Sequence, residues 1–215
     1  MKVSASILDC DFLRLAEELQ AVEQAGVDSI HLDVMDGHFV PNLSFGTPIG
    51  RRVREATSLP LHSHLMVIRP GEVIDMFLPF SDLVVFHVEA ADDPARCIEH
   101  IHKAGRQAGM SLNPDTPVES LRPFLPELQD VLVMSVFPGR GGQEFIEESL
   151  ERIRAIRRMI AETGSESSVS VDGGVKPANC RAVADAGTDV AIAGSAIFRS
   201  VDYASVAREL RCSRP

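Results

Sequence analysis

The feature that most constrains this fold is a repeated alternation between a short β-rich run and a longer run with helical periodicity. Strands such as Leu83-Val84-Val85-Phe86 are apolar on both faces, which is typical of a sheet that has helices outside and a core inside. Eight such units in 215 residues predict a single closed (β/α)8 TIM barrel over 1–215 rather than an open doubly wound sheet. The strands are expected to begin near Lys2, Asp28, Pro60, Asp82, Arg106, Gln129, Ser168 and Asp189.

Helix start and stop signals agree with this alternation. Gly26 and Gly187 each end a helical run and directly precede a strand, as a glycine in the left-handed conformation does. A proline stands at four positions where a first helical turn would begin, namely Pro70, Pro94, Pro117 and Pro177. The clearest helices are expected at 12–25, 94–104, 146–162 and 177–186.

Charge and composition indicate a small-molecule partner. The net charge is −10 and no Lys/Arg cluster recurs on one face, which argues against nucleic acid and anionic membrane surfaces. No apolar run approaches membrane-spanning length, and Asp9 and Asp11 interrupt the amino-terminal run before a signal-peptide core could form. The four cysteines are far apart and lack C-x-x-C spacing, which suits a reducing compartment. We therefore expect a cytoplasmic protein.

Titratable side chains concentrate at the expected carboxyl ends of the strands, where the active sites of such barrels lie. Strand side chains alternate between faces, so His31 and Asp33 point the same way. Alone, this pair would either bind a metal or form a buried hydrogen bond. Further strand ends contribute His64 on the third strand, His87-Val88-Glu89 on the fourth and Asp172 on the seventh.

Two imidazoles and two carboxylates at one rim form a metal-ligand set. Such nitrogen and oxygen donors suit Zn, Fe(II), Mn or Co, so we expect one divalent metal ion whose identity the sequence leaves open. A hydrogen-bonded core histidine is the alternative for any one of the imidazoles, but four coincident rim positions favour the metal. The set consists of His31, Asp33, His64 and Asp172.

The two carboxylates come from well-separated strands of the ring. Asp33 and Asp172 are therefore expected to face each other across a substrate, where one can remove a proton from a carbon and the other can return one to the opposite face. That is epimerisation through a planar enediolate, whose charge a metal stabilises. Hydrolysis would not require bases on both faces.

Glycine-rich loops follow the last three strands, at 138–143, 172–174 and 193–196. Glycines let backbone N–H groups close on an anion, and the loops after strands seven and eight commonly hold phosphate. Each glycine pair alone also suits an ordinary turn, but three at one rim predict a phosphate site. The loop 139–142 is further expected to act as a lid. Three methionines beside strand ends either fill the core or cushion this lid, namely Met35, Met66 and Met134.

Over nearly its whole length the chain resembles the ribulose-phosphate 3-epimerase family. The most specific motif is His31-x-Asp33-x-Met35-Asp36-Gly37-His38-Phe39-Val40-Pro41-Asn42. The others are Ser6-Ile7-Leu8, His64-Leu65-Met66, Leu112-Asn113-Pro114, Pro138-Gly139-x-Gly141-Gly142-Gln143, Val171-Asp172-Gly173-Gly174 and Ala193-Gly194-Ser195.

The resemblance implies an isomerase of the pentose phosphate pathway that interconverts D-ribulose 5-phosphate and D-xylulose 5-phosphate. It implies a divalent metal on the four ligands above, with Asp33 as proton acceptor and Asp172 as proton donor. It also implies a homo-oligomer, a dimer or a hexamer. Substrate contacts are implied for Ser6, His64, Gly139, Arg140, Gly141, Gly142, Asp172, Gly173, Gly174, Gly194 and Ser195.

Some positions depart from the family pattern. Ala5 replaces a usual proline, and Asp9-Cys10 replaces Ser-Ala. In Leu61-His62-Ser63-His64, His62 replaces an aspartate one layer below the metal, which could change the orientation of His64 and the metal affinity. Arg140 replaces a frequent aromatic in the lid and adds a cation near the sugar phosphate.

These departures leave three alternatives. One is an epimerase acting on a hexulose phosphate such as D-allulose 6-phosphate. Another is a non-catalytic phosphosugar-binding barrel, in which His62 and Arg140 mark lost activity. The last is a metal-free phosphate barrel resembling orotidine decarboxylases or indole synthases. It lacks its expected lysine at a strand end, since the only lysines are Lys2, Lys103 and Lys176.

Overall fold

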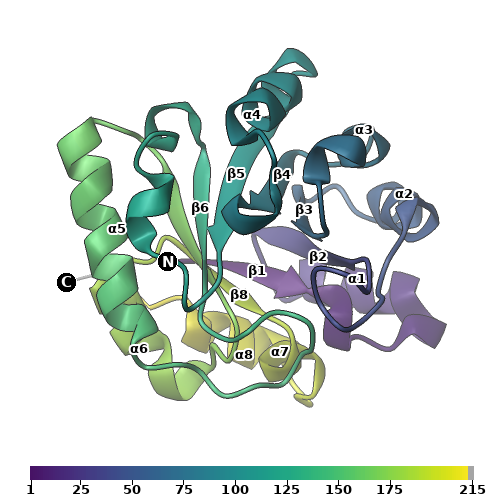
Figure 1. The fold of residues 1–215 in the computed structure, drawn as a ribbon. Coiled ribbons are helices and arrows are strands. Elements are labelled where there is room, and N and C mark those ends of the chain that lie inside the picture. The colour runs from purple at the N-terminus through teal and green to yellow at the C-terminus, as the bar shows by residue number, and fades with distance from the viewer. Residues whose placement is uncertain (213–215) are drawn as a thin grey trace.

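Residues 1–212 are described by a computed structural model, in which eight parallel strands close into one barrel (Figure 1). Each strand pairs with its sequence neighbours, and β8 pairs with β1 to close the ring. The predicted (β/α)8 barrel is confirmed, while the last three residues of the expected domain, 213–215, lie outside the described residues. The strands are β1 (Lys2–Ser6), β2 (Ser29–Met35), β3 (Leu61–Met66), β4 (Leu83–His87), β5 (Gln107–Leu112), β6 (Asp130–Met134), β7 (Ser168–Asp172) and β8 (Val190–Ala193).

Helices surround the strands in Figure 1. All four expected helices lie within three residues of their predicted bounds, and the 12–25 helix opens with a 3-10 turn at Phe12–Arg14. The expected 146–162 helix starts three residues late, at Ser149. The helices are α1 (Leu15–Gln24), α2 (Thr47–Ala56), α3 (Ile74–Phe77), α4 (Pro94–Lys103), α5 (Ser149–Thr163), α6 (Pro177–Ala186), α7 (Ser195–Phe198) and α8 (Tyr203–Leu210).

The connection from β5 to β6 is the irregular unit. It contains two 3-10 helices, Val118–Leu121 and Leu125–Glu127, in place of an α-helix. Pro123 and Pro126 lie within this stretch, and proline lacks the N–H that a helix interior needs and clashes with the preceding turn. The helical turn expected at Pro117 therefore forms only as a short 3-10 segment.

Both predicted helix-ending glycines are confirmed. Gly26 has φ +83° and Gly187 has φ +119°, a backbone conformation that residues other than glycine rarely adopt. The chain then turns at once into β2 and β8, and the amide of Val27 donates to the carbonyl of Val22 at 3.3 Å. Short connections of this kind align each strand with its helix.

The strands bury both faces. Val3, Ala5 and Ile30 belong to a large core shared with the surrounding helices. A smaller cluster contains Leu132 and Met134, which share a strand face because they are two residues apart. Since Met134 lines the pocket described below, this second cluster fills the barrel interior.

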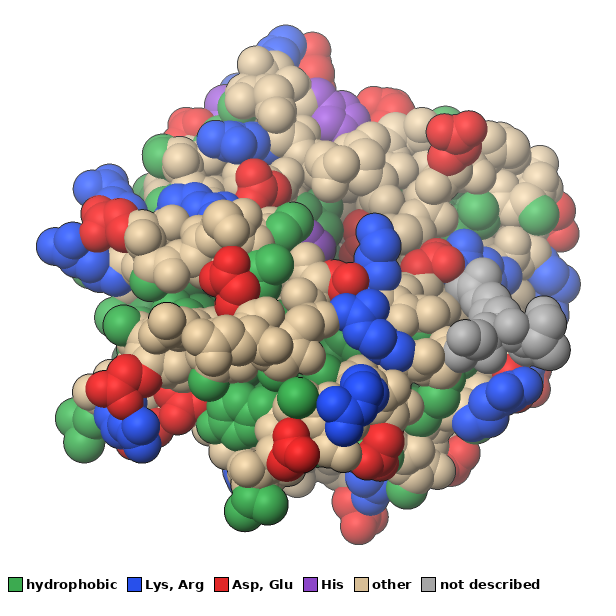
Figure 2. Space-filling model, turned by 180° about the vertical axis from the view of Figure 1, so that it is seen from behind, with side chains coloured by type: hydrophobic (Ala, Val, Ile, Leu, Met, Phe, Trp, Pro, Cys, Tyr) green, Lys and Arg blue, Asp and Glu red, His purple; other side chains and the backbone are tan. Residues whose placement is uncertain are grey.

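The surface mixes charges. On the face seen in Figure 2, Lys and Arg side chains lie among acidic ones, and a histidine lies inside a hollow near the centre. Among the described residues, no helix is both long enough and apolar enough to cross a membrane.

Asp130 is buried at the start of β6, at the end of the barrel opposite the strand carboxyl ends. Its Oδ1 accepts hydrogen bonds from Ser168 Oγ at 2.5 Å and Ser170 Oγ at 2.8 Å. Burial nevertheless raises the pKa of Asp130 from 3.8 to about 6. The ionised form is therefore less stable in the folded chain than in the unfolded chain.

We expect Asp130→Asn to stabilise the protein at pH 8. A carboxyl whose pKa is raised on folding contributes its stability below the unfolded pKa and loses it as pH rises through the folded value, here between about pH 4 and pH 6. The gain should approach about 3 kcal/mol at pH 8 and fall below about 1 kcal/mol at pH 4. Urea unfolding at both pH values measures it, with exposed Asp115→Asn as control. A less stable Asp130→Asn protein at pH 8 would contradict the argument.

Candidate active site

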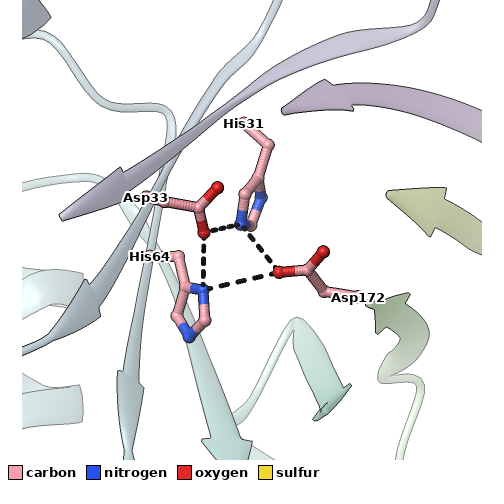
Figure 3. Close-up of side chains that lie close together, drawn as sticks. All are labelled: His31, Asp33, His64 and Asp172. Atoms are coloured by element: carbon pink, nitrogen blue, oxygen red, sulfur yellow. Dashed lines mark hydrogen bonds and ion pairs between the residues drawn. The ribbon is translucent and has the colours of Figure 1, made fainter. Parts of the chain in front are cut away.

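Strand register brings the predicted ligands together. β2 and β3 pair so that Asp33 lies opposite His64, and His31 precedes Asp33 by two residues on the same strand face. Asp172 is the last residue of β7, which is three strands away around the ring. All four side chains point toward one another (Figure 3).

The four side chains form a compact cluster. Asp33 Oδ1 lies 3.3 Å from both His31 Nε2 and His64 Nδ1. Asp172 Oδ2 lies 3.9 Å from the same His31 nitrogen and 4.0 Å from the same His64 nitrogen. One ligand atom from each residue lies within 4.8 Å of the others, so the set can surround a single ion.

The chemistry of the donors fits a divalent metal. His31 is 1% exposed, and among residues 1–212 neither of its ring nitrogens has a hydrogen-bond partner, although a buried polar atom normally has one. Its Nε2 faces one oxygen of Asp33 and one of Asp172, and a nitrogen and two carboxylate oxygens of this kind can bind the same cation. A cluster of two imidazoles and two carboxylates could therefore hold a metal ion.

The two carboxylates differ in their electrostatic surroundings. Burial opposes the ionisation of Asp33, but His31 and His64 beside it hold its pKa well below the usual range. Burial and the neighbouring Asp33 charge raise the pKa of Asp172 to about 7. One carboxyl thus favours the ionised form and the other the protonated form.

The imidazoles differ as well. Burial works against a charged His31, yet Asp33 and Asp172 raise its pKa above the ordinary value. Burial lowers the pKa of His64 to about 3, which keeps that ring neutral. The two rings thus differ in how readily they take up a proton beside the same Asp33 carboxylate.

Hydrogen bonds fix the orientation of Asp33. Its second oxygen, Oδ2, accepts from Ser6 Oγ at 2.5 Å, which leaves Oδ1 for the imidazoles. The Asp33 backbone carbonyl accepts from Ser44 Oγ at 2.5 Å. Ser6, predicted to contact substrate, therefore also positions a carboxylate.

A pocket opens above this cluster at the carboxyl rim. Asp33 and Asp172 line it, whereas His31 and His64 are buried. Met35, Met66 and Met134 line it too, a position compatible with both of their predicted roles. The remaining predicted site residues in the lining are Ser6, Gly139, Arg140, Gly141, Gly142, Gly173, Gly174, Gly194 and Ser195.

Close backbone approach explains Gly174. It has φ +65°, and a Cβ at this position would lie 2.5 Å from the amide nitrogen of Phe145. Only glycine fits there, so the loop after β7 can pack directly against the segment that follows β6.

The expected lid contacts the loop after β2. The Asn42 side chain donates to the Gly139 carbonyl at 3.0 Å. Within the lid segment, Gln143 Nε2 donates to the carbonyls of Phe137 at 2.7 Å and Arg140 at 2.9 Å. These contacts place 138–143 over one side of the pocket. Movement of this loop stays a prediction.

Sequence reasoning missed an ion pair at the glycine end of the pocket. Asp9 lines the pocket beside Gly141 and Gly194, and its Oδ1 accepts from Arg199 at 2.8 Å. The departure of Asp9 from the family pattern was visible in the sequence. Its partner was not, since Arg199 is 190 residues away.

His62 precedes His64 by two residues on β3 and lies below the cluster, toward the amino-terminal end of the barrel. Its side chain lines a hollow at the amino-terminal end of the barrel together with Asp130, and burial lowers its pKa to about 4. Within residues 1–212, the two ring nitrogens of His64 contact Asp33 and His87. An effect of His62 on His64 remains a prediction.

The fold and this cluster define a class of protein, namely a TIM barrel with a candidate metal site of two His and two Asp at the carboxyl ends of its strands. Residues 2–198 match the model of the family described as the ribulose-phosphate 3 epimerase family. The chain belongs to the ribulose-phosphate 3-epimerase family, whose members are isomerases.

Curated relatives agree with this assignment. The chain is 43% identical over 215 residues to the ribulose-phosphate 3-epimerase of Synechocystis sp., covering 99% of this chain and 94% of the relative. It is 41% identical over 216 residues to the Bacillus subtilis enzyme of the same name, with full coverage of both. These matches span nearly the whole chain.

Solved structures with similar folds are more distant in sequence. A 3-hexulose-6-phosphate synthase superposes with a TM-score of 0.73 at 22% identity, covering 98% of both chains. Phosphoribosyl anthranilate isomerase from Thermus thermophilus gives 0.67 at 16% identity, covering 98% of this chain and 96% of that one. These likenesses show the fold alone.

Proposed function

We propose that this protein is a metal-dependent epimerase that interconverts D-ribulose 5-phosphate and D-xylulose 5-phosphate by proton transfer at C3. The observation that supports this most is the placement of Asp33 and Asp172 on β2 and β7, facing one cluster from different sides of the barrel. Asp33 accepts the C3 proton, and Asp172 delivers a proton to the opposite face. Family membership supports the same reaction.

The metal is proposed to be Zn, Fe(II), Mn or Co. His31, Asp33, His64 and Asp172 would hold it, because their donor atoms already converge. When bound, a divalent cation supplies positive charge that stabilises a developing enediolate. The protein itself positions the two carboxyl groups and buries the imidazoles away from water.

The sugar phosphate is proposed to lie along the glycine loops. Gly173, Gly174, Gly194 and Ser195 line one end of the pocket, where backbone N–H groups can bind the phosphate. The lid segment Gly139 to Gly142, including Arg140, would close over the sugar and exclude water. His64, whose side chain is fully buried, is proposed to contact the substrate as well.

Incubating the metal-loaded enzyme with D-ribulose 5-phosphate in deuterated water tests the proposal. NMR should show deuterium entering at C3 together with formation of D-xylulose 5-phosphate. Absence of exchange would instead support a binding protein without catalysis. A large kcat/KM preference for D-allulose 6-phosphate in competition would support the hexulose alternative.

We also propose a homo-oligomer, a dimer or a hexamer, in the cytoplasm. Exposed apolar side chains on the segments after β1 and β2 support self-association, since Leu13 is 97% exposed and Leu43 is 74% exposed. The Phe12 ring, 46% exposed, extends this apolar surface and packs 5.2 Å from that of Phe45. Sedimentation velocity at micromolar concentration tests the assembly, and a monomer would contradict it.

A further inference from the structure

A second histidine lies behind the metal-type cluster. His64 directs Nδ1 toward the cluster and its other nitrogen, Nε2, toward His87 Nε2 at 2.9 Å. The two ring planes differ by 21° and the centroids are 5.0 Å apart. Because the nitrogens lie closer together than the ring centres, the rings meet edge to edge. This is the geometry of an N–H···N hydrogen bond.

Glu89 continues the chain of contacts. His87 Nδ1 lies 3.3 Å from Glu89 Oε2. The other carboxylate oxygen, Oε1, accepts from the Asn113 amide at 2.7 Å and from the Thr116 hydroxyl. The Phe39 ring packs against His87 at 4.6 Å and limits its rotation. The carboxylate is therefore held in place with one oxygen turned to the imidazole.

Burial opposes the ionisation of Glu89, but hydrogen bonds from His87, Thr116 and Asn113 lower its pKa to about 2. An ionised carboxylate only accepts hydrogen bonds. It therefore requires the proton of a neutral His87 ring on Nδ1, and His87 Nε2 must then accept from His64 Nε2. This leaves a lone pair on His64 Nδ1.

The two imidazoles do not carry enough protons for a hydrogen bond at every contact in this chain of side chains. Three junctions run in series, between Asp33 and His64, between His64 and His87, and between His87 and Glu89. Two neutral imidazoles supply one proton each, so one junction has none. The orientation set by Glu89 leaves that gap between His64 Nδ1 and the Asp33 carboxylate. Two lone pairs face each other there at 3.3 Å, and a bound cation would supply the positive charge that this contact lacks.

We propose that His87 and Glu89 are positioning residues that hold His64 in the tautomer whose Nδ1 can bind the metal. The inference rests on the proposed metal site and deepens it. Neither residue lies in the cluster itself, and both act through the His64 ring. Partners that orient a metal-ligating histidine commonly change metal affinity by about 10- to 100-fold.

Glu89→Gln tests the series with an isosteric change. Glutamine that keeps its oxygen toward Asn113 and Thr116 presents an NH₂ group to His87 Nδ1. That donor reverses each tautomer in turn and places a proton on His64 Nδ1, where it blocks the metal. A flipped amide would restore the tautomer only by losing both hydrogen bonds to Oε1.

The measurement is Zn²⁺ affinity by competition with a chromophoric chelator, without any substrate. We expect Glu89→Gln to bind Zn²⁺ about 10- to 100-fold more weakly than the wild type. ¹⁵N shifts of the imidazole nitrogens should show the Nε2–H tautomer of His64 in the zinc-loaded wild type and Nδ1–H in metal-free Glu89→Gln. The exposed Glu127→Gln variant serves as the matched control and should bind like the wild type.

Thr116→Val tests whether any loss of a hydrogen bond to Glu89 weakens metal binding, or only a change in the contact between Glu89 and His87. It removes a hydrogen bond to Glu89 Oε1 but keeps the contact with His87, so we expect a loss of Zn²⁺ affinity below threefold. The inference is overturned if Glu89→Gln loses less than tenfold, or if Thr116→Val loses as much. A wild type that binds no metal would instead contradict the proposed metal site itself.

Discussion

Replacing Asp172 with Asn should abolish turnover while phosphosugar binding is retained. Asparagine keeps the shape of the side chain but cannot deliver a proton, and general acid–base groups typically contribute about 10²- to 10⁴-fold to rate. The barrel does not require this carboxyl, because Asp172 sits at the pocket end of β7 and its backbone carbonyl holds the Ser135 amide at 2.8 Å. We therefore expect a folded protein with little activity.

A coupled-enzyme assay measures the turnover of Asp172→Asn, and calorimetry measures its binding of the product. Both measurements are made at saturating divalent metal. Asp130→Asn is the matched control, since it makes the same substitution at the other end of the barrel and should keep the wild-type rate. An Asp172→Asn enzyme within tenfold of the wild-type rate would refute the donor role.

Removing the metal should cost at least about 100-fold in activity, because donors aimed at a developing oxyanion are typically worth that much or more. Prolonged chelation followed by gel filtration should give a folded but inactive protein. Added Zn, Fe(II), Mn or Co should restore activity, and metal analysis of the restored enzyme identifies the ion. Full activity after rigorous chelation would count against the ligand set.

Metal removal should also lower thermal stability. A ligand that binds only the folded state stabilises it by about 2.7 kcal/mol at 100 times its Kd. The shift should be absent when His31 is replaced by Ala, because this variant loses a ligand whose two buried ring nitrogens have no hydrogen-bond partner within residues 1–212. Differential scanning calorimetry with and without metal measures this shift.

Most of the fold was predictable because local chemistry determines it. Each strand begins within one residue of its expected start, since apolar runs bounded by Gly, Pro and Asp define strands locally. The β5 to β6 connection was less predictable. Pro117 indicated a helix start, but two further prolines allowed only 3-10 turns.

The candidate site was predictable where one rule applies, namely that polar residues at strand ends face the rim. That rule identified His31, Asp33, His64 and Asp172 as a group, and the structure brings them together. It also pointed to His87 and Glu89 as polar rim residues without a role. Assigning that role required the 2.9 Å contact between two imidazoles, because only measured geometry shows which nitrogen faces which.

The sequence by itself determined the barrel, its helix ends and the set of side chains at its rim, because periodicity and caps act over a few residues. Only the tertiary structure decided which atoms meet. Arg199 pairs with Asp9 across 190 residues, and His62 lies at the end of the barrel opposite the pocket. The physical reason is that strand register and barrel closure, which depend on all eight strands at once, set these distances.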